Sequence, residues 1–209
     1  MKNRLLKAKR RTRNSLSRKE ILDVSLDIIQ KEGIQSLNMR SIAKNLKCSV
    51  ASPYNHFRSQ EEIIQALIQE GEEKLAQDLM LAKLNNQTVY TQLREIAHTY
   101  RNFATANIEL HKLMFTTLNK RKGNTSKKII TTVPKSYRIF LDTLRSGFKN
   151  GSIPLPRKEF HGIVRTMWSW IYGLIILELT GLLNSKDNSE NPIEEGISVF
   201  SQALKIEKK

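Results

Sequence analysis

Side chains that can donate hydrogen bonds to anionic groups gather in one short stretch, Pro53-Tyr54-Asn55-His56-Phe57-Arg58. A tyrosine hydroxyl, an amide and an imidazole N–H can all hold phosphate oxygens without reading a base sequence. No carboxylate or cysteine constellation surrounds His56 in the sequence, so neither a metal ligand nor a catalytic base is indicated there. Phosphate binding is one chemistry that suits this stretch, and packing of His56 against its aromatic neighbours is the alternative.

The overall charge points in the same direction. The 209 residues contain 35 Lys and Arg against 20 Asp and Glu, a net charge of +15 that favours polyanions. Nucleic acid and an anionic membrane are both compatible with this charge, and solubility alone would also account for it. Residues 1–19 hold nine basic side chains and no acid, which predicts an extended basic arm over 1–16. Arg13 is its candidate phosphate contact, and a solvated tail is the alternative.

Helix signals flank the donor-rich stretch on both sides. Ser17 and Ser59 each precede a Glu by three residues, which predicts capping boxes that open two helices. Asn38 is placed to cap a short helix between them, and Ser49 to cap another that runs to about Phe57. The tripeptide Lys47-Cys48-Ser49 then forms the turn of a helix-turn-helix.

The remainder of the chain keeps a helical apolar period and shows no strand alternation. Pro134 predicts a kink, or a late helix start near Val133, in the third of the helices expected there. The sequence therefore predicts an all-α fold of about nine helices, a three-helix head followed by a helical body. The body helices are expected at 88–106, 108–118, 129–148, 159–183 and 193–206, after a long helix that begins near residue 59.

Several function classes are excluded by what the sequence lacks. It contains no paired-carboxylate, Cys/His, metal-spaced or Gly-rich phosphate motif, so we expect no enzyme activity, no cofactor and no metal. The apolar run between Arg165 and Glu178 is 12 residues long, whereas a membrane-spanning helix needs about 20. One cysteine forbids an internal disulfide and, with no secretory signal, favours a cytoplasmic protein without membrane attachment.

The segment from Ser17 to about Leu67 resembles the DNA-binding domain of TetR/AcrR-type bacterial transcriptional regulators. The resemblance is carried by Met39-Arg40-Ser41-Ile42-Ala43, Ser49-Val50-Ala51-Ser52-Pro53-Tyr54-Asn55-His56-Phe57 and Ser59-Gln60-Glu61-Glu62-Ile63-Ile64. In the body, Asn107-Ile108-Glu109-Leu110-His111-Lys112-Leu113-Met114-Phe115 and Trp168-x-x-x-Tyr172-Gly173 are similar to one subgroup, with Tyr172 where His is usual. The implied domains are a basic arm (1–16), a DNA-binding domain (17–62) and a ligand-binding and dimerisation domain (63–209).

The resemblance implies two kinds of DNA contact. The residues implied to face base edges are Arg40, Val50, Ala51 and Ser52; those implied to contact phosphates are Tyr54, Asn55 and His56. Small residues on a first helical turn could equally be spacers, and Arg40 could contact phosphate or solvent instead. Phe57 is expected to anchor the helix to the core.

Two positions depart from the family pattern. Lys47 stands where many members have Gly, which costs about 1 kcal/mol if the turn needs left-handed backbone. Gln60 replaces a Lys that commonly touches phosphate, and the basic arm is the candidate to compensate.

The family also implies partners for the body. The helices at 159–183 and 193–206 would form a homodimer interface, because the first is apolar almost all round from Met167 to Leu177; full burial within one chain is the alternative. The candidate lining of a small-molecule effector pocket comprises Tyr100, Phe103, His111, Phe115, Tyr137, Trp168 and Tyr172, and the same residue types often form only core. His111 and Arg138 are the polar candidates for an anionic effector.

The resulting hypothesis is a homodimeric repressor that binds a palindromic double-stranded DNA operator and releases it when an effector binds. A non-specific nucleoid- or RNA-associated basic protein is the main alternative, and a peripheral membrane protein with a basic arm is another.

Overall fold

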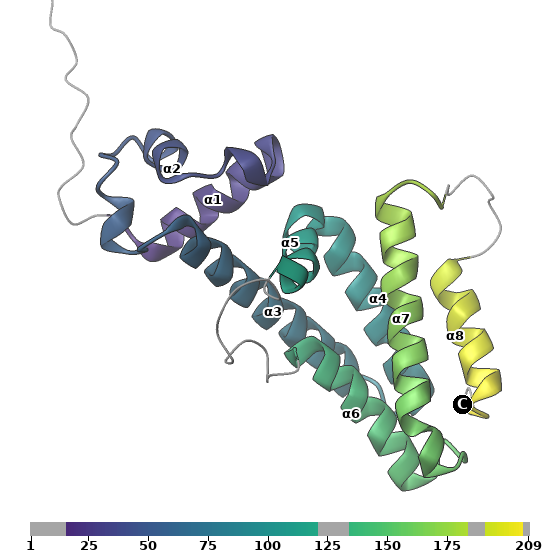
Figure 1. The fold of residues 1–209 in the computed structure, drawn as a ribbon. Coiled ribbons are helices and arrows are strands. Elements are labelled where there is room, and N and C mark those ends of the chain that lie inside the picture. The colour runs from purple at the N-terminus through teal and green to yellow at the C-terminus, as the bar shows by residue number, and fades with distance from the viewer. Residues whose placement is uncertain (1–15, 121–133, 184–190, 207–209) are drawn as a thin grey trace, which may run out of the picture. The chain divides into compact units, whose positions relative to one another are not determined.

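The computed structural model describes residues 16–120, 134–183 and 191–206, with the backbone alone for 116–120, and every regular element in these ranges is helical (Figure 1). The all-α prediction is confirmed. The chain divides into two compact units, a head of residues 1–67 and a body of residues 68–209. The basic arm with Arg13 lies outside the described residues. The α-helices are α1 (Arg18–Glu32), α2 (Met39–Asn45), α3 (Gln60–Leu84), α4 (Val89–Ala106), α5 (Ile108–Lys120), α6 (Lys135–Asn150), α7 (Phe160–Leu179) and α8 (Pro192–Ala203).

The head is built by the predicted caps. Ser17 and Glu20 form a capping box at α1, and the Asn38 side chain accepts hydrogen bonds from the N–H groups of Arg40 and Ser41 at α2. These caps satisfy N–H groups that have no partner inside their helix. The apolar faces then close around residues that are at most 2% exposed, namely Ile21, Leu22, Ile28, Ile29, Leu37, Ile42, Ala43, Phe57 and Ile63.

The turn after α2 has the hydrogen bonds of a Schellman motif. The Cys48 N–H donates to the Ala43 carbonyl at 3.0 Å, and the Lys47 N–H donates to the Lys44 carbonyl at 3.2 Å. This pattern requires a left-handed residue directly after the helix, and Lys47 has φ of 53°. Lys47 therefore has the left-handed backbone that a glycine would adopt without strain, and its side chain makes this conformation less favourable.

The predicted third helix of the head, Ser49 to about Phe57, is wrong in form. Pro53 has no N–H, so it cannot donate to the Ser49 carbonyl, which accepts instead from the Ser52 N–H at 2.9 Å. The chain continues as a short 3₁₀ helix, Pro53–Asn55, with the His56 N–H donating to the Pro53 carbonyl. The described ranges hold eight α-helices and three short 3₁₀ helices, at Ile34–Ser36, Pro53–Asn55 and Arg157–Glu159.

In the body, α4 is the central helix. It packs against α5, α6, α7 and α8, and its buried face consists of Val89, Leu93, Ile96, Ala97, Tyr100, Phe103 and Ala104. The predicted late start of α6 is confirmed, because Pro134 is its N-cap. Helix α7 ends at Leu179 rather than at residue 183, because Gly181 (φ 72°) begins a second Schellman turn in which the Leu182 N–H donates to the Leu177 carbonyl.

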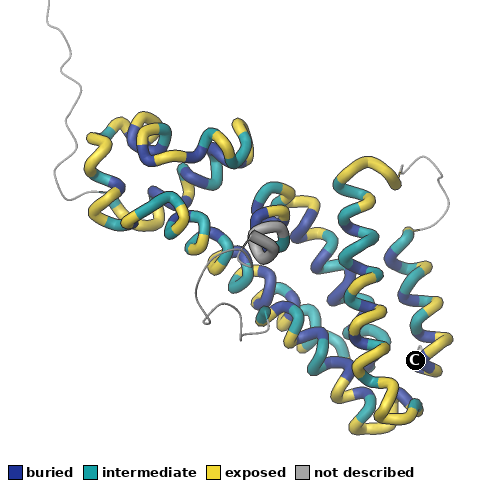
Figure 2. The backbone as a smooth tube through the Cα atoms, in the orientation of Figure 1, coloured by how far each residue is buried: buried dark blue, intermediate teal, exposed yellow. Residues whose placement is uncertain are grey.

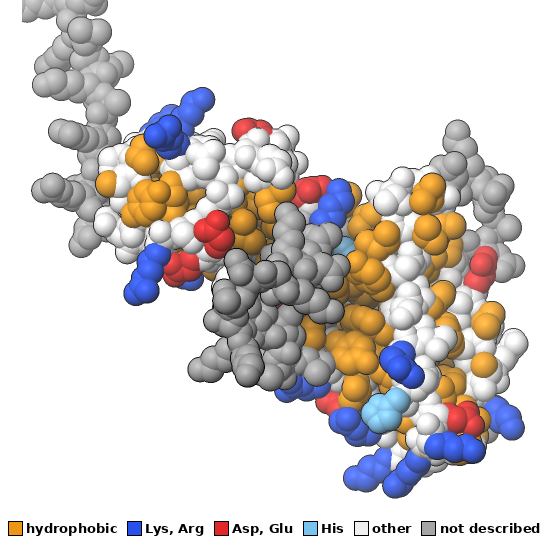
Figure 3. All heavy atoms as spheres, viewed as in Figure 1, with side chains coloured by type: hydrophobic (Ala, Val, Ile, Leu, Met, Phe, Trp, Pro, Cys, Tyr) orange, Lys and Arg blue, Asp and Glu red, His pale blue; other side chains and the backbone are white. Residues whose placement is uncertain are grey.

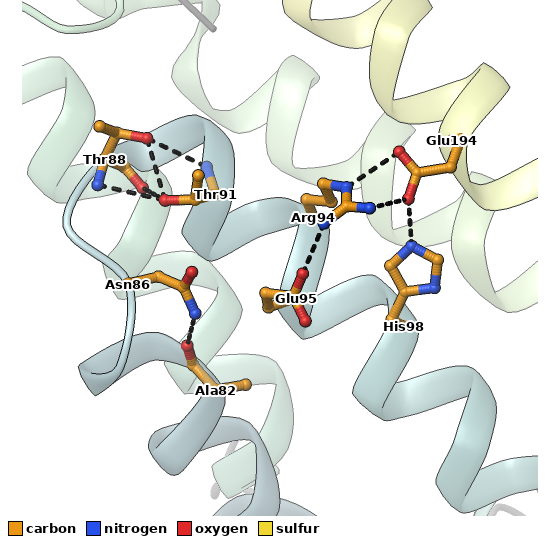
Figure 4. A network of polar contacts seen from close by, with 8 residues as sticks. All are labelled: Ala82, Asn86, Thr88, Thr91, Arg94, Glu95, His98 and Glu194. Atoms are coloured by element: carbon orange, nitrogen blue, oxygen red, sulfur yellow. Dashed lines mark hydrogen bonds and ion pairs between the residues drawn. The ribbon is translucent and has the colours of Figure 1, made fainter. Parts of the chain in front are cut away.

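A polar network joins α8 to α4 (Figure 4). Arg94 donates to Glu194 through Nε at 2.9 Å and through its terminal nitrogen at 2.8 Å, and His98 Nε2 bonds the same carboxylate. The hydrogen bond from Arg94, more than that from His98, holds the pKa of Glu194 below its ordinary value. A depressed carboxylate pKa stabilises the fold above the unfolded-state pKa, about 4.3, and this stabilisation is lost as the pH falls through the lower folded value.

Replacing Glu194 with Gln is expected to lower the free energy of unfolding at pH 7 by about 1 kcal/mol, and this difference should shrink as the pH falls below about 4.3. Urea unfolding across this pH range measures it. The matched control is Glu195→Gln, because Glu195 lies in the same first turn of α8 and is exposed. Equal losses in the two variants would assign the effect to the helix terminus rather than to the Arg94 network.

Replacing Lys47 with Gly is expected to stabilise the head by about 0.5–1 kcal/mol, because glycine adopts positive φ without steric cost. Lys44→Gly is the matched control; Lys44 is also exposed but lies inside α2, where glycine should destabilise by about 1 kcal/mol. Thermal unfolding of both variants distinguishes the two effects, and a destabilised Lys47→Gly protein would contradict the strain assigned to this turn.

Candidate functional site

The stretch from Val50 to His56 presents side chains to solvent on the head. Val50 and Tyr54, four residues apart, are 47% and 52% exposed, although both are large and largely apolar. Ala51 and Asn55 are exposed, and Ser52 and His56 are half-buried. Exposed Val and Ala side chains are chemically able to meet a thymine methyl group in a major groove.

Two hydroxyl groups of this stretch are already paired. Ser49 Oγ and Ser52 Oγ lie 2.8 Å apart. One of the two hydroxyls donates to the other, which keeps its own O–H, and both keep acceptor capacity for a base or a water. Ser52 therefore lies in the same exposed stretch as Val50 and Ala51, the residues with which it was predicted to face base edges.

Arg40 lies on the first turn of α2 and is exposed. Lys44, one turn later, and Lys47, in the following turn, are exposed as well. Within the described part of the chain none of these three cations forms an ion pair. Free cations beside an exposed hydrogen-bonding segment are what a polyanion surface needs.

Phe57 anchors the exposed stretch, as predicted. Its ring is 1% exposed, and the Arg18 guanidinium lies over it at 4.0 Å from the ring centroid. Arg18 also donates to the His56 carbonyl at 3.2 Å and lies 3.9 Å from the Glu62 carboxylate. Sequence reasoning missed this positioning role, because Arg18 was counted with the basic residues of the N-terminal region. Its place one residue after the Ser17 cap was the available signal.

Six of the seven predicted pocket residues form one aromatic cluster in the body. Tyr100 stacks on Trp168 at 5.4 Å between centroids, and Trp168 meets Tyr137 edge-on at 5.0 Å. His111 and Phe115 extend the cluster from α5, with centroids 4.8 Å apart, and Tyr172 of α7 lies 5.2 Å from Phe115. The seventh residue, Phe103, is buried on α4 but makes none of these ring contacts. Phe140 joins the cluster through Trp168.

His111 is buried and only partly hydrogen-bonded. It is 0% exposed, and its Nε2 lies 3.1 Å from the hydroxyl of Tyr100, which is 1% exposed. Its Nδ1 is buried without a hydrogen-bond partner, a condition that costs about 1–3 kcal/mol. Burial lowers the pKa of His111 to about 4 and raises that of Tyr100. His111 is therefore neutral near pH 7, and Arg138 is exposed on α6, so the expected anion-binding pair is not assembled here.

A narrow apolar crevice lies next to this cluster, with room for about one water molecule. Of the candidate residues predicted from the sequence, Tyr100, Trp168 and also Phe140, an aromatic residue of the same set, line it. The other lining residues are Leu79, Leu93, Ile96, Ala97, Met167, Trp170, Ile171 and Ile197. Their helical spacing marks core and pocket wall alike, so no sequence signal separates the two.

Helix α7 is less covered than its composition requires. Among the described residues, the stretch Arg157–Leu179 is long and apolar enough to cross a membrane by length and composition alone, yet only 28% of its apolar window is buried within the chain. Figure 3 shows hydrophobic side chains gathered along this helix, and Figure 2 shows how little of it is fully buried. On α7 and the neighbouring α8, Leu177 is 41% and Val199 64% exposed.

Comparison with solved structures shows the same fold in several bacterial proteins. A protein of unknown function from Rhodococcus sp. RHA1 is 22% identical, with a TM-score of 0.76 over 89% of this chain and 94% of that one. The TetR family transcriptional regulator PfmR from Thermus thermophilus is 18% identical (TM-score 0.62; 90% and 99% covered). The fatty acid degradation regulator FadR from Bacillus halodurans is 15% identical (TM-score 0.65; 95% and 96% covered).

Sequence comparison identifies the family. A search of curated proteins found no match. Residues 21–67 match the family described as "Bacterial regulatory proteins, tetR family". Residues 93–200, more than half of the chain, match "Tetracyclin repressor-like, C-terminal domain". The chain belongs to the tetR family of bacterial regulatory proteins, and it is a DNA-binding regulator of transcription.

Proposed function

We propose that this protein is a homodimeric repressor in the cytoplasm that binds a palindromic operator and releases it when a small molecule occupies the body. The observation that carries the proposal is the exposed stretch Val50–His56, anchored by Phe57, in a head that matches the family's DNA-binding region. In this assignment residues 17–62 bind DNA, and residues 63–209 bind the effector and dimerise.

The proposed contacts divide by chemistry. Val50, Ala51 and Ser52 would face base edges, with Arg40 able to grip guanine O6 and N7 together. Tyr54, Asn55 and His56, as hydrogen-bond donors, would fix the register on phosphates. Gln60 adds no charge at the start of α3, so the basic arm with Arg13 would supply that part of the affinity.

The proposed dimer uses α7 and α8. Trp170 of α7 lies directly over Gly196 of α8, where an added Cβ would be 1.9 Å from the indole, and it contacts Phe200 at 5.2 Å. The two helices therefore form one closely packed layer with apolar residues left on the outside. A second copy of the same layer would cover them and complete a four-helix interface.

Release would follow from a coupling free energy between the effector site and DNA. The boundary between head and body falls within α3, which contributes residues to both units. An effector that favours one conformation of the body would, through α3, change the spacing of the two heads in the dimer. Half-sites about 34 Å apart would then no longer be matched together.

Val199→Asp is expected to weaken the dimer, because it would bury a charge in the proposed interface. Sedimentation of the wild type at micromolar concentration should give a dimer, and the variant should shift toward monomer by at least about tenfold in Kd. Glu195→Asp, an exposed acid-for-acid change on the same helix, is the control. A wild-type monomer with specific DNA affinity would remove the dimer from the proposal.

Arg40→Ala is expected to relax base preference at one position per half-site, at about 1–3 kcal/mol, while leaving affinity for random DNA nearly unchanged. A gel-shift selection from fragments of the source genome at fixed salt supplies the operator, and single-base variants of that operator measure the preference.

The double variant Tyr54→Phe/His56→Ala tests whether these two side chains contact the DNA phosphates rather than the bases. It should weaken binding to all sequences alike, because contacts to phosphates carry no sequence information. If this variant lost affinity only for particular base sequences, Tyr54 and His56 would contact bases rather than phosphates. If Arg40→Ala lost affinity for all sequences equally, Arg40 would contact phosphate rather than a base.

A further inference from the structure

In the described part of the body, one buried side-chain polar atom has no hydrogen-bond partner. His111 Nδ1 is enclosed by aromatic rings and has no hydrogen-bond partner, whereas its other nitrogen meets Tyr100 Oη at 3.1 Å. A leucine or phenylalanine would fill the same space without leaving a polar atom unpaired. The histidine is therefore costly as a packing residue, and a molecule that enters the cluster can recover that cost.

The pairing with Tyr100 determines what His111 can offer. A phenol O–H is a good donor and an imidazole nitrogen is a good acceptor, and within the described residues Tyr100 Oη has no other hydrogen-bond partner. Tyr100 therefore donates to Nε2, which places the single proton of the neutral ring on Nδ1. The unpaired atom is then an N–H donor, and its missing partner is a hydrogen-bond acceptor.

The surroundings restrict the charge and the shape of that partner. Among the described residues the ring cluster offers no cation to an anion, because His111 is uncharged and Arg138 is exposed on α6. The Glu72 carboxylate of the neighbouring α3 accepts a hydrogen bond from Ser136 Oγ at 2.9 Å and adds negative charge nearby. Phe115 and Tyr172 are both half-buried and lie 4.8 and 6.1 Å from the His111 ring between centroids. A flat aromatic molecule can stack on these two rings beside His111.

We propose that His111 Nδ1 is the hydrogen-bond donor of the effector site, and that the site takes an uncharged, planar aromatic compound carrying a carbonyl acceptor. This inference rests on the proposed effector-released function and specifies its ligand. Tyr100 acts as a positioning residue, because its hydroxyl fixes the tautomer of His111, and its ring, stacked on Trp168, joins the site to the neighbouring crevice.

Three naphthalenes of similar shape test the proposal with the full chain. The first, 2-acetylnaphthalene, carries the carbonyl; 2-ethylnaphthalene lacks an acceptor; and 2-naphthoate replaces the ketone with an anion. Calorimetry, with quenching of tryptophan fluorescence as a second readout, should show wild-type protein binding the ketone about tenfold more tightly than the ethyl compound. The naphthoate should bind most weakly of the three.

The variant His111→Phe removes the donor and keeps an aromatic ring, so it should bind the ketone and the ethyl compound with equal affinity. Because this variant leaves the Tyr100 hydroxyl unpaired, the double variant Tyr100→Phe/His111→Phe is made beside it. Removing both polar partners should leave the thermal midpoint unchanged or higher, and the preference for the ketone should again be absent.

The proposal is overturned if wild-type protein binds none of the three, binds the ketone and ethyl compounds equally, or prefers the naphthoate. It is also overturned if either variant keeps the preference for the ketone. Specific DNA binding, measured on the same preparations, separates this inference from the proposed function. If the protein binds specific DNA but does not distinguish the three compounds, only the proposed ligand class is wrong. If it distinguishes the compounds but they do not release DNA, only the proposed release mechanism is wrong.

Discussion

The burial of Phe57 is the constraint on which the DNA-binding surface depends. The stretch from Val50 to His56 is too short and too interrupted by Pro53 to hold a helical form by itself, because helix nucleation is unfavourable in so few residues. Its shape comes from the buried Phe57 ring and from the Arg18 guanidinium above it. A cation over an aromatic ring contributes about 0.5–1 kcal/mol, and Arg18 adds a hydrogen bond to the His56 carbonyl. The backbone of the exposed stretch is thus fixed by Phe57 and Arg18, and its exposed side chains remain free to contact DNA.

In the body, the polar groups of Tyr100 and His111 are buried within an aromatic core. Helix α4 carries Tyr100 into the cluster on its buried side. Its other side carries Arg94, which holds Glu194 of α8, and Arg101, which bonds Glu178 of α7 at 2.7 Å. These ion pairs fix α7 and α8 against α4 at the periphery. The aromatic cluster between them is held by apolar contacts and by the Tyr100–His111 hydrogen bond, the one hydrogen bond that joins two cluster side chains in the described part of the chain.

Local signals in the sequence were sufficient for most of the fold. Ser17 and Asn38 cap their helices because capping depends on residues within one turn, and Pro134 starts α6 for the same reason. The form of the 49–57 stretch was not predictable in this way, since Pro53 alters the hydrogen bonding of residues before it. The end of α7 was missed because Leu182 and Leu183 continue the apolar pattern beyond Gly181, whose left-handed backbone ends the helix. The Tyr100–His111 bond joins two helices, and no periodicity reports such a pairing.

The side chains proposed to read bases explain why a small displacement of the heads would suffice for release. Val50 and Ala51 carry no charge, so their contribution depends on close van der Waals contact, and a gap of about 0.5–1 Å already removes about a quarter to a half of that attraction. Charge attraction from Lys and Arg falls off over about 8–10 Å at physiological salt. A change in head spacing of one or two ångströms would therefore remove the sequence-specific part of the affinity first and leave the non-specific part nearly intact. In the proposed mechanism the dimer leaves its operator but keeps its non-specific affinity for DNA.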